Sequence, residues 1–172
     1  MVIKGLDESD VVNYKKTSMF IAFPSCTFKC ERECGQKMCQ NSSLVQAPNI
    51  EINVQDLVNK YLSNPITSAI VCGGLEPFDS VKDLVSLIHC FRQKTNDDII
   101  IYTGYTKDEI KNMQYTIHYS WGKQNYSYFG EITKYPNIII KFGRFIPNQQ
   151  PHYDEVLGVK LASDNQYAER IS

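Results

Sequence analysis

The chain has 172 residues, of which 42% are hydrophobic and 22% are charged, as is usual for one folded domain. Its 18 lysines and arginines nearly balance its 19 aspartates and glutamates, which argues against a general polyanion binder. No apolar run approaches the ~20 residues of a membrane-spanning helix, and the N-terminus carries no signal segment. We therefore expect a single cytoplasmic domain over residues 1–172, without a nucleic-acid or membrane partner.

Seven segments alternate between the patterns of strands and helices. Short apolar runs are typical of buried strands, and apolar residues three and four apart are typical of helices. In chain order the predicted elements are strand 17–23, helix 53–62, strand 68–72, helix 79–91, strand 98–102, helix 106–113 and strand 137–142. Of the remaining stretches, 114–134 fits either a hairpin or an ordered loop, and 144–172 fits an extended C-terminal tail.

The order of these elements predicts the fold class. Alternating strands and helices favour an α/β fold with parallel strands and right-handed crossovers. Several strands are continuously apolar, as expected when both faces of a sheet are covered. At the helix starts, Asp79 is a candidate cap, and Thr106 with Glu109 fits a capping box. The units are too few for a closed eight-stranded barrel, so we expect a partial, open TIM-like barrel with mostly parallel strands.

Most of the cysteines lie directly after the first predicted strand. Four of the six fall within residues 26–39: Cys26, Cys30, Cys34 and Cys39. A reducing compartment argues against disulfides, so this group indicates a metal site, an iron–sulfur site or redox chemistry. Four thiolates could close a tetrahedral zinc site, whereas three could hold a four-iron cluster with one iron open. The short spacing weakens the zinc interpretation without excluding it. The isolated Cys72 and Cys90 are expected to be small buried apolar groups.

Three unusual segments follow three different predicted strands. The cysteine-rich segment follows the first strand, Gly73-Gly74 the second and Thr103-Gly104 the third. The carboxyl ends of parallel strands meet at one edge of a sheet, and in α/β folds that edge carries the site. We therefore expect these three segments to form one functional site.

The cysteine spacing also resembles that of a known superfamily. Cys26-x₃-Cys30 followed by Cys39-Gln40-Asn41 resembles the cluster loop of radical S-adenosylmethionine enzymes. Within that superfamily the chain is most similar to the activating proteins of anaerobic ribonucleotide reductase. Further segments resemble motifs of these proteins in the same order: Asp10–Asn13, Gly73–Pro77, Ile101–Tyr105 and Asn165-Gln166. The resemblance covers most of the chain, apart from an unmatched insertion at residues 112–134.

The choice of a third cluster ligand departs from the superfamily pattern. The usual spacing is C-x₃-C-x₂-C, but here Cys39 lies farther from Cys30, and Cys34 lies between them. We favour Cys39 because Gln40-Asn41 follows it, as in the family, and because apolar Met38 precedes it. Cys34 is the alternative third ligand.

The resemblance implies a radical mechanism. Cys26, Cys30 and Cys39 would hold a [4Fe–4S] cluster, and the amino and carboxylate groups of S-adenosylmethionine would chelate its open iron. One electron would cleave the sulfonium into methionine and a 5′-deoxyadenosyl radical, which would abstract a hydrogen from a glycine of a partner. The expected partner is a large glycyl-radical enzyme, anaerobic ribonucleotide reductase, and the expected electron donor is a flavodoxin or a ferredoxin.

The resemblance also implies which residues bind the cofactor, with no catalytic residue beyond the cluster ligands. They are Asn41, Gly73, Gly74, Glu76, Tyr102 and Thr103. The two glycines would let the backbone approach the methionine end, whose ammonium would donate to Glu76. Tyr102 and Thr103 would contact the adenosine, and Asn41 the cluster or the cofactor.

Two alternatives stay open on the sequence. The chain could be a radical S-adenosylmethionine enzyme that acts on another peptide or on a small molecule. It could also be a zinc- or cluster-binding interaction module without catalysis. Iron and sulfide content, together with S-adenosylmethionine cleavage, would separate this module from the enzymes.

Overall fold

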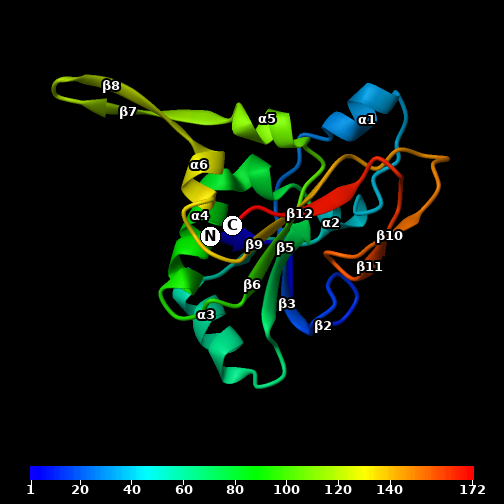
Figure 1. The fold of residues 1–172 in the computed structure, drawn as a ribbon, viewed down its shortest axis with the longest axis horizontal. Coiled ribbons are helices and arrows are strands. Elements are labelled where there is room, and N and C mark those ends of the chain that lie inside the picture. The colour runs from blue at the N-terminus through cyan, green and yellow to red at the C-terminus, as the bar shows by residue number, and fades with distance from the viewer.

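The computed structural model describes residues 1–172 and shows a six-stranded mixed sheet between helices and the C-terminal segment (Figure 1). Four parallel strands form its centre, in the order β3 (Ser18–Phe23), β5 (Ala69–Gly74), β6 (Asp98–Tyr102) and β9 (Ile138–Phe142). Antiparallel strands form both edges: β2 (Gly5–Asp10) pairs with β3, and β12 (Tyr167–Arg170) pairs with β9. The carboxyl ends of the four central strands therefore lie side by side.

The remaining elements surround this sheet. Three two-stranded antiparallel sheets pair β1 (Val2–Ile3) with β4 (Ile50–Glu51), β7 (Gln114–Tyr119) with β8 (Gly122–Ser127), and β10 (His152–Asp154) with β11 (Val159–Leu161). The helices are α1 (Lys29–Cys34), α2 (Ser43–Gln46), α3 (Val54–Ser63), the 3₁₀ helix η1 (Pro77–Ser80), α4 (Val81–Arg92), α5 (Lys107–Lys111) and α6 (Tyr128–Ile132). None of them combines the length and apolar composition that a membrane span requires.

The expected partial, open TIM-like barrel with mostly parallel strands is wrong. The chain is a small mixed α/β protein with several antiparallel sheets and 27% of its residues in helices. A TIM-like barrel continues its sheet with further parallel strands. Here the antiparallel strands β2 and β12 end the parallel run at both edges after four strands, so the sheet is mixed. The sequence of β2, Gly-Leu-Asp-Glu-Ser-Asp, has three acidic residues, so no apolar run marks it as a strand.

Several local predictions can be compared directly with the structure. The four apolar runs predicted as strands form β3, β5, β6 and β9. The capping box at α5 is present, with Thr106 and Glu109 each accepting the backbone N–H of the other. The predicted cap at Asp79 is wrong, because Ser80 is the N-cap of α4. The Asp79 carboxylate instead accepts hydrogen bonds from Thr27 N and Tyr105 Oη.

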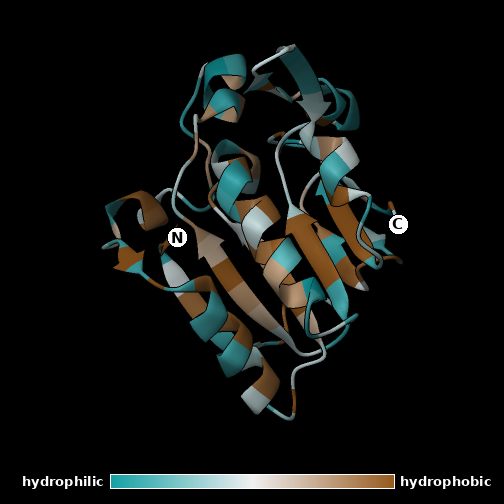
Figure 2. Cartoon of the chain, turned by 90° about the vertical axis from the view of Figure 1, so that its left-hand side faces the viewer, coloured by the Kyte–Doolittle hydropathy of each residue, from teal (hydrophilic) through white to brown (hydrophobic).

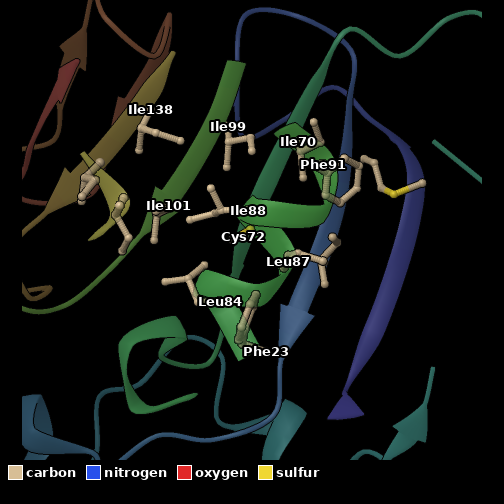
Figure 3. Packing of buried hydrophobic residues seen from close by; sticks show 14 of the residues in the cluster. Phe23, Ile70, Cys72, Leu84, Leu87, Ile88, Phe91, Ile99, Ile101 and Ile138 are labelled. Atoms are coloured by element: carbon tan, nitrogen blue, oxygen red, sulfur yellow. The ribbon is translucent and has the colours of Figure 1, made fainter. Parts of the chain in front are cut away.

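The larger core lies between the sheet and helices α3 and α4. Figure 3 shows Leu84, Leu87 and Ile88 of α4 facing the side chains of the central strands. In Figure 2 the central strands are mostly hydrophobic ribbons, whereas the helices alternate between hydrophilic and hydrophobic colours, as expected of elements with one buried face. Cys72 is fully buried in this core, as predicted, and Cys90 is partly buried against it. The sheet therefore holds its strand ends on a close-packed base.

The insertion and the tail have regular structure of their own. Of the two alternatives for residues 114–134, the hairpin is the one that forms, as β7 and β8 followed by α6. The hairpin projects away from the body of the protein (Figure 1), and Trp121 is 73% exposed. Residues 144–172 contain β10, β11 and β12, and Leu157 and Leu161 pack on the second face of the sheet. That packing makes the C-terminal segment one wall of the site described next.

Candidate metal centre

A cavity of about 460 Å³ opens at the carboxyl ends of the central strands. It is lined by three of the four clustered cysteines and by all six residues proposed to bind the cofactor, namely Cys26, Cys30, Cys39, Asn41, Gly73, Gly74, Glu76, Tyr102 and Thr103. Cys34 does not line it and faces a neighbouring cavity of about 570 Å³ instead. The sheet topology brings these separated segments together because β3, β5 and β6 are adjacent parallel strands.

The cysteines lie on a segment of low burial, residues 24–49, which we call the cysteine loop. Neither α1 nor α2 has a buried residue. Helix α1 is a short turn between Phe28 and Gly35, which both have left-handed backbone conformations. Cys30 lies within α1, and Cys34 ends it, exposed to solvent. The loop therefore depends on polar contacts for its position.

The three cavity thiols form a donor set that suits an iron–sulfur cluster. Burial raises the pKa of Cys26 to about 12 and also raises the pKa of Cys30, so both are protonated until a metal displaces the proton. No three histidine, cysteine, aspartate or glutamate side chains converge on one point as ligands of a single metal ion. A four-iron cluster carries its own sulfides and holds its thiolate ligands farther apart than one ion does. Three soft thiols around one cavity fit that larger group.

Two hydrogen-bonded contacts place the end of the cysteine loop over the cavity. Glu31 Oε1 accepts from the backbone N–H groups of Met38 and Cys39, at 3.1 and 3.0 Å. Asn41 Nδ2 donates to Gly74 O at 2.7 Å and so joins the loop to the end of β5. The longer interval between Cys30 and Cys39 is therefore folded back onto α1 by Glu31, a contact that the sequence pattern did not indicate.

Glu76 joins the turns that follow β5 and β6. Its carboxylate is buried and accepts from Phe78 N at 3.1 Å, from Thr103 Oγ1 at 2.8 Å and from Gly104 N at 2.8 Å. Burial raises the pKa of Glu76 to about 7, although these three hydrogen bonds favour the charged form. A carboxylate has about four acceptor positions, so one is left for a ligand in the cavity.

The two glycines that end β5 are required first by the packing of the chain itself. A Cβ at Gly74 would lie 2.8 Å from Ala22 of β3, and Gly74 has a φ of +82°. A Cβ at Gly73 would lie 3.0 Å from the Phe20 ring. Close approach to a ligand would therefore be an additional use of residues that the neighbouring strand already restricts.

Tyr102 and Thr103 end β6 inside the cavity with their hydroxyl groups engaged. Tyr102 Oη donates to Asn13 O at 2.5 Å, which connects the Asp10–Asn13 segment to the site. Thr103 Oγ1 donates to Glu76, as described above. The faces and backbone of these residues, rather than their hydroxyl protons, are left for a ligand.

A group of ion pairs that sequence reasoning missed fastens the cysteine loop to α5. The Arg144 guanidinium contacts Glu109 with two nitrogens, at 2.9 and 2.7 Å, and Glu33 with its Nε at 3.1 Å. Lys29 of α1 also pairs with Glu109. The hydrogen bonds from Arg144 are the largest cause that holds the pKa of Glu109 well below its usual range, and the hydrogen bond from Lys29 lowers it further. We call Lys29, Glu33, Glu109 and Arg144 the loop latch.

Sequence reasoning also missed a buried lysine. Lys141 lies in β9 between Ile140 and Phe142, is 6% exposed and lines the main cavity. Burial lowers its pKa to about 8. A charged residue inside an otherwise apolar strand is the signal that could have identified it.

Comparison with protein families indicates which metal group the cysteines bind. A family described as a 4Fe-4S single cluster domain matches residues 15–153, which contain every cysteine of the loop and all six cofactor candidates. The chain belongs to the 4Fe-4S single cluster domain family. This family is found in radical S-adenosylmethionine-type proteins, and the chain is a [4Fe–4S] cluster-binding domain. A search of the curated proteins found no match.

Proposed function

We propose that this 4Fe-4S single cluster domain is a radical S-adenosylmethionine enzyme that generates a glycyl radical on a partner protein. The supporting observation is the single cavity that joins Cys26, Cys30 and Cys39 to the two glycines that end β5 and to the end of β6. The bound cluster would supply one electron to the sulfonium of S-adenosylmethionine. Anaerobic ribonucleotide reductase is the expected partner, and a flavodoxin or ferredoxin the expected electron donor.

The proposed reaction balances with one electron. That electron would enter the sulfonium and break the C5′–S bond, which would give methionine and a 5′-deoxyadenosyl radical. The radical would take one hydrogen atom from a glycine Cα of the partner, which would yield 5′-deoxyadenosine and a glycyl radical. The protein's part is to orient the reactants and exclude water, and a cavity of about 460 Å³ falls within the usual range of ligand sites.

For the cluster we propose Cys26, Cys30 and Cys39 as ligands. The support for Cys39 is its place on the cavity wall and the two backbone hydrogen bonds to Glu31 that hold its segment there. Cys34 is exposed and faces the other cavity, which argues against it as the third ligand.

For the cofactor we propose the turns after β5 and β6. Glu76 keeps one acceptor position for the methionine ammonium, and Gly73 and Gly74 form the adjacent wall. Tyr102 and Thr103 would contact the adenosine through ring and backbone. Asn41 is already bound to Gly74 O, so it would close the loop over the ligand rather than supply a free donor.

The test is anaerobic reconstitution followed by three measurements on one preparation. We expect four irons and four sulfides per chain, 5′-deoxyadenosine after strong reduction, and a glycyl radical in electron paramagnetic resonance only when a reductase is added. Cys34→Ala is the matched control and should retain all three. A protein that binds the cluster but cleaves no S-adenosylmethionine would refute the enzyme proposal. Cleavage without a radical on any reductase would refute the partner alone.

A further inference from the structure

Tyr105 joins the core to the cysteine loop, and no part of the proposed function uses it. It follows β6 and Thr103-Gly104, and its side chain packs against the larger core. Its backbone N–H donates to Thr103 Oγ1 at 3.0 Å, and its carbonyl accepts from Gly143 N at 3.1 Å. The sheet side of the molecule therefore fixes the position of Tyr105 independently of the loop.

The hydroxyl group of Tyr105 is bound to the start of the cysteine loop through Asp79. Tyr105 Oη donates to Asp79 Oδ1 at 2.6 Å, and Asp79 Oδ2 accepts from Thr27 N at 2.5 Å. Thr27 Oγ1 lies 3.4 Å from Tyr105 Oη and is the donor of that pair, because the phenol proton already points to Asp79. These two side chains thus hold both the N–H and the hydroxyl of Thr27, the residue directly after Cys26.

The ring of Tyr105 attracts two cations of the loop latch. Lys29 Nζ lies 5.8 Å from the ring centre, and Arg144 Cζ lies 5.6 Å from it. Both distances fall within the ~6 Å over which a cation is attracted to an aromatic ring. Lys29 directly precedes Cys30, so Tyr105 interacts with two of the three residues that separate Cys26 from Cys30.

The position of Tyr105 relative to the cavities separates it from the residues proposed to bind the cofactor. Tyr105 is not part of the wall of the main cavity. It lines a smaller cavity of about 30 Å³ together with Cys26 and Cys30. A space of that size has room for about one water molecule and not for a cofactor. The contacts of Tyr105 are therefore directed at the segment that carries the two thiols.

These contacts suit positioning better than they suit stabilisation of the fold. Thr27 is exposed, and Lys29 and Arg144 are partly exposed, so water could satisfy their polar groups in place of Tyr105. Exposed contacts of this kind contribute little to the net stability of a protein. Water cannot supply a fixed position for residues 27–29, none of which is fully buried.

We propose that Tyr105 is a positioning residue of the iron–sulfur centre, whose hydroxyl and ring hold residues 27–29 so that the Cys26 and Cys30 thiols keep one arrangement. Metal binding and local folding are coupled, so a loop that is held in advance loses less of the binding free energy to ordering. This inference rests on Cys26 and Cys30 as the ligands assigned in the proposed function, and it extends the centre to a residue outside the ligand set.

The test compares Tyr105→Phe, which keeps the ring and loses the hydroxyl, with Tyr105→Leu, which loses both. On anaerobically reconstituted protein we would measure the rate at which a chelator removes iron and the electron paramagnetic resonance spectrum of the reduced cluster. Iron release should be about fivefold faster in Tyr105→Phe, as expected for the loss of one hydrogen bond, and faster still in Tyr105→Leu. The spectrum of Tyr105→Leu should also broaden, because the two thiols no longer keep one arrangement.

A double variant tests whether the hydroxyl acts through Asp79. Asp79→Ala should also speed iron release, because it removes the acceptor of both Tyr105 and Thr27. Tyr105→Phe combined with Asp79→Ala should release iron little faster than Asp79→Ala alone. Effects that multiply would show that the two side chains act independently, and they would overturn the role given to the hydroxyl.

Tyr153 supplies a matched control for the loss of a tyrosine. It is 60% exposed on β10, and Tyr153→Phe and Tyr153→Leu should match wild type in both measurements. If Tyr105 only supports the fold, its variants should lower the melting temperature of cluster-free protein and leave iron release and the spectrum of loaded protein unchanged, which would overturn the proposal. Tyr105→Phe removes one oxygen atom and decides the question where Tyr105→Leu does not fold.

S-adenosylmethionine cleavage, measured on the same samples, distinguishes the two proposals. Normal cleavage by wild type, with iron release unchanged in both Tyr105 variants, would refute the positioning role alone. Absent cleavage by wild type, with faster iron release in the Tyr105 variants, would refute the radical function and leave Tyr105 as a positioning residue of the cluster.

Discussion

The central sheet and the cysteine loop are held in place by different kinds of interaction. Strands β5, β6 and β9 are almost entirely buried and pack under α4. The cysteine loop has no fully buried residue; Glu31 folds it back on itself, and hydrogen bonds and ion pairs hold it to Asp79, Gly74, Glu109 and Arg144. Apolar burial contributes roughly 1.5–3 kcal/mol for each large side chain, whereas an exposed ion pair contributes at most about 1 kcal/mol.

Because of this difference, we expect the sheet and the cysteine loop to have different roles in the site. We expect Glu76, Thr103 and Lys141 to keep their positions whether or not a cluster is bound, because Lys141 lies in β9 and the other two directly follow the core strands β5 and β6. The loop carries the thiols, and the bound cluster would itself order that loop, since metal binding and local folding are coupled. Substitutions in the loop should therefore change cluster binding, and substitutions in the sheet should change stability.

Removing a proposed cluster ligand should have the largest effect. Cys39→Ala should abolish the stable four-iron cluster, because the cavity keeps only two thiols, whereas Cys34→Ala should keep it. Iron and sulfide analysis with the visible absorption spectrum measures both. The reverse pattern would assign the third ligand to Cys34 and would show that the loop rearranges when it binds the cluster.

A core substitution should show the opposite behaviour. Ile101 is fully buried between β6 and α4, so Ile101→Ala should cost about 2–5 kcal/mol in the free energy of unfolding. Cluster content per folded molecule should stay unchanged. Urea denaturation and iron analysis of the folded fraction test this, with the exposed Leu62→Ala of α3 as the control. A cluster lost in proportion to stability would mean that loop and sheet form one cooperative unit.

The same division explains which parts of the fold could be predicted from the sequence. The apolar runs of β3, β5, β6 and β9 carry their own signal, and so does the capping box of α5. The edge strands do not: β2 is acidic and β12 reads Tyr-Ala-Glu-Arg, so each becomes a strand only by pairing with a core neighbour. Missing these two edges led to the incorrect barrel.

Some parts of the site could be predicted from the sequence and others could not. The order of the segments predicts that the cysteines and the two turns lie at one edge of the sheet, because the carboxyl ends of parallel strands meet there. The contacts of Glu31, Asp79 and Arg144 could not be predicted, because each depends on how loops fold in three dimensions. Asp79 shows this well: its position suggests a helix cap, but the folded chain uses it to hold Thr27 of the cysteine loop.

A substitution at Glu76 tests whether this residue contributes to stability, as the sheet does, or to cluster binding, as the cysteine loop does. Glu76→Ala should cost about 1–3 kcal/mol in stability, because it leaves the buried donors of Phe78, Thr103 and Gly104 without an acceptor. It should also weaken binding of S-adenosylmethionine while leaving the cluster spectrum intact. Calorimetric binding and urea denaturation measure the two effects. Loss of the cluster itself would place Glu76 in the metal centre rather than beside it.

Weakening the loop latch should have a smaller effect on the free energy of unfolding, but it should measurably change the rate at which iron is lost from the cluster. Glu109→Gln weakens the pairs with Arg144 and Lys29, which are partly exposed, so the cost in stability should stay below about 1 kcal/mol. The cysteine loop should open more often, and a chelator should remove iron a few times faster than from wild type. Glu131→Gln breaks a surface pair with Lys134 and is the matched control. Unchanged iron release would show that the cluster alone holds the loop.

The pH dependence of the latch should give the smallest effect. Its pairing with Arg144, the largest cause, holds the pKa of Glu109 below its usual value of about 4.3, so folding favours the charged form. A group with a lowered folded pKa stabilises the protein above its unfolded pKa and loses that contribution as the pH falls. The stability difference between wild type and Glu109→Gln should therefore be constant near neutrality and shrink below about pH 4.3. Urea denaturation of cluster-free protein measures this without interference from acid release of iron. A difference that did not shrink at all as the pH fell below about 4.3 would mean that Glu109 acts through packing, and the loop would then resemble the sheet more than its exposure suggests.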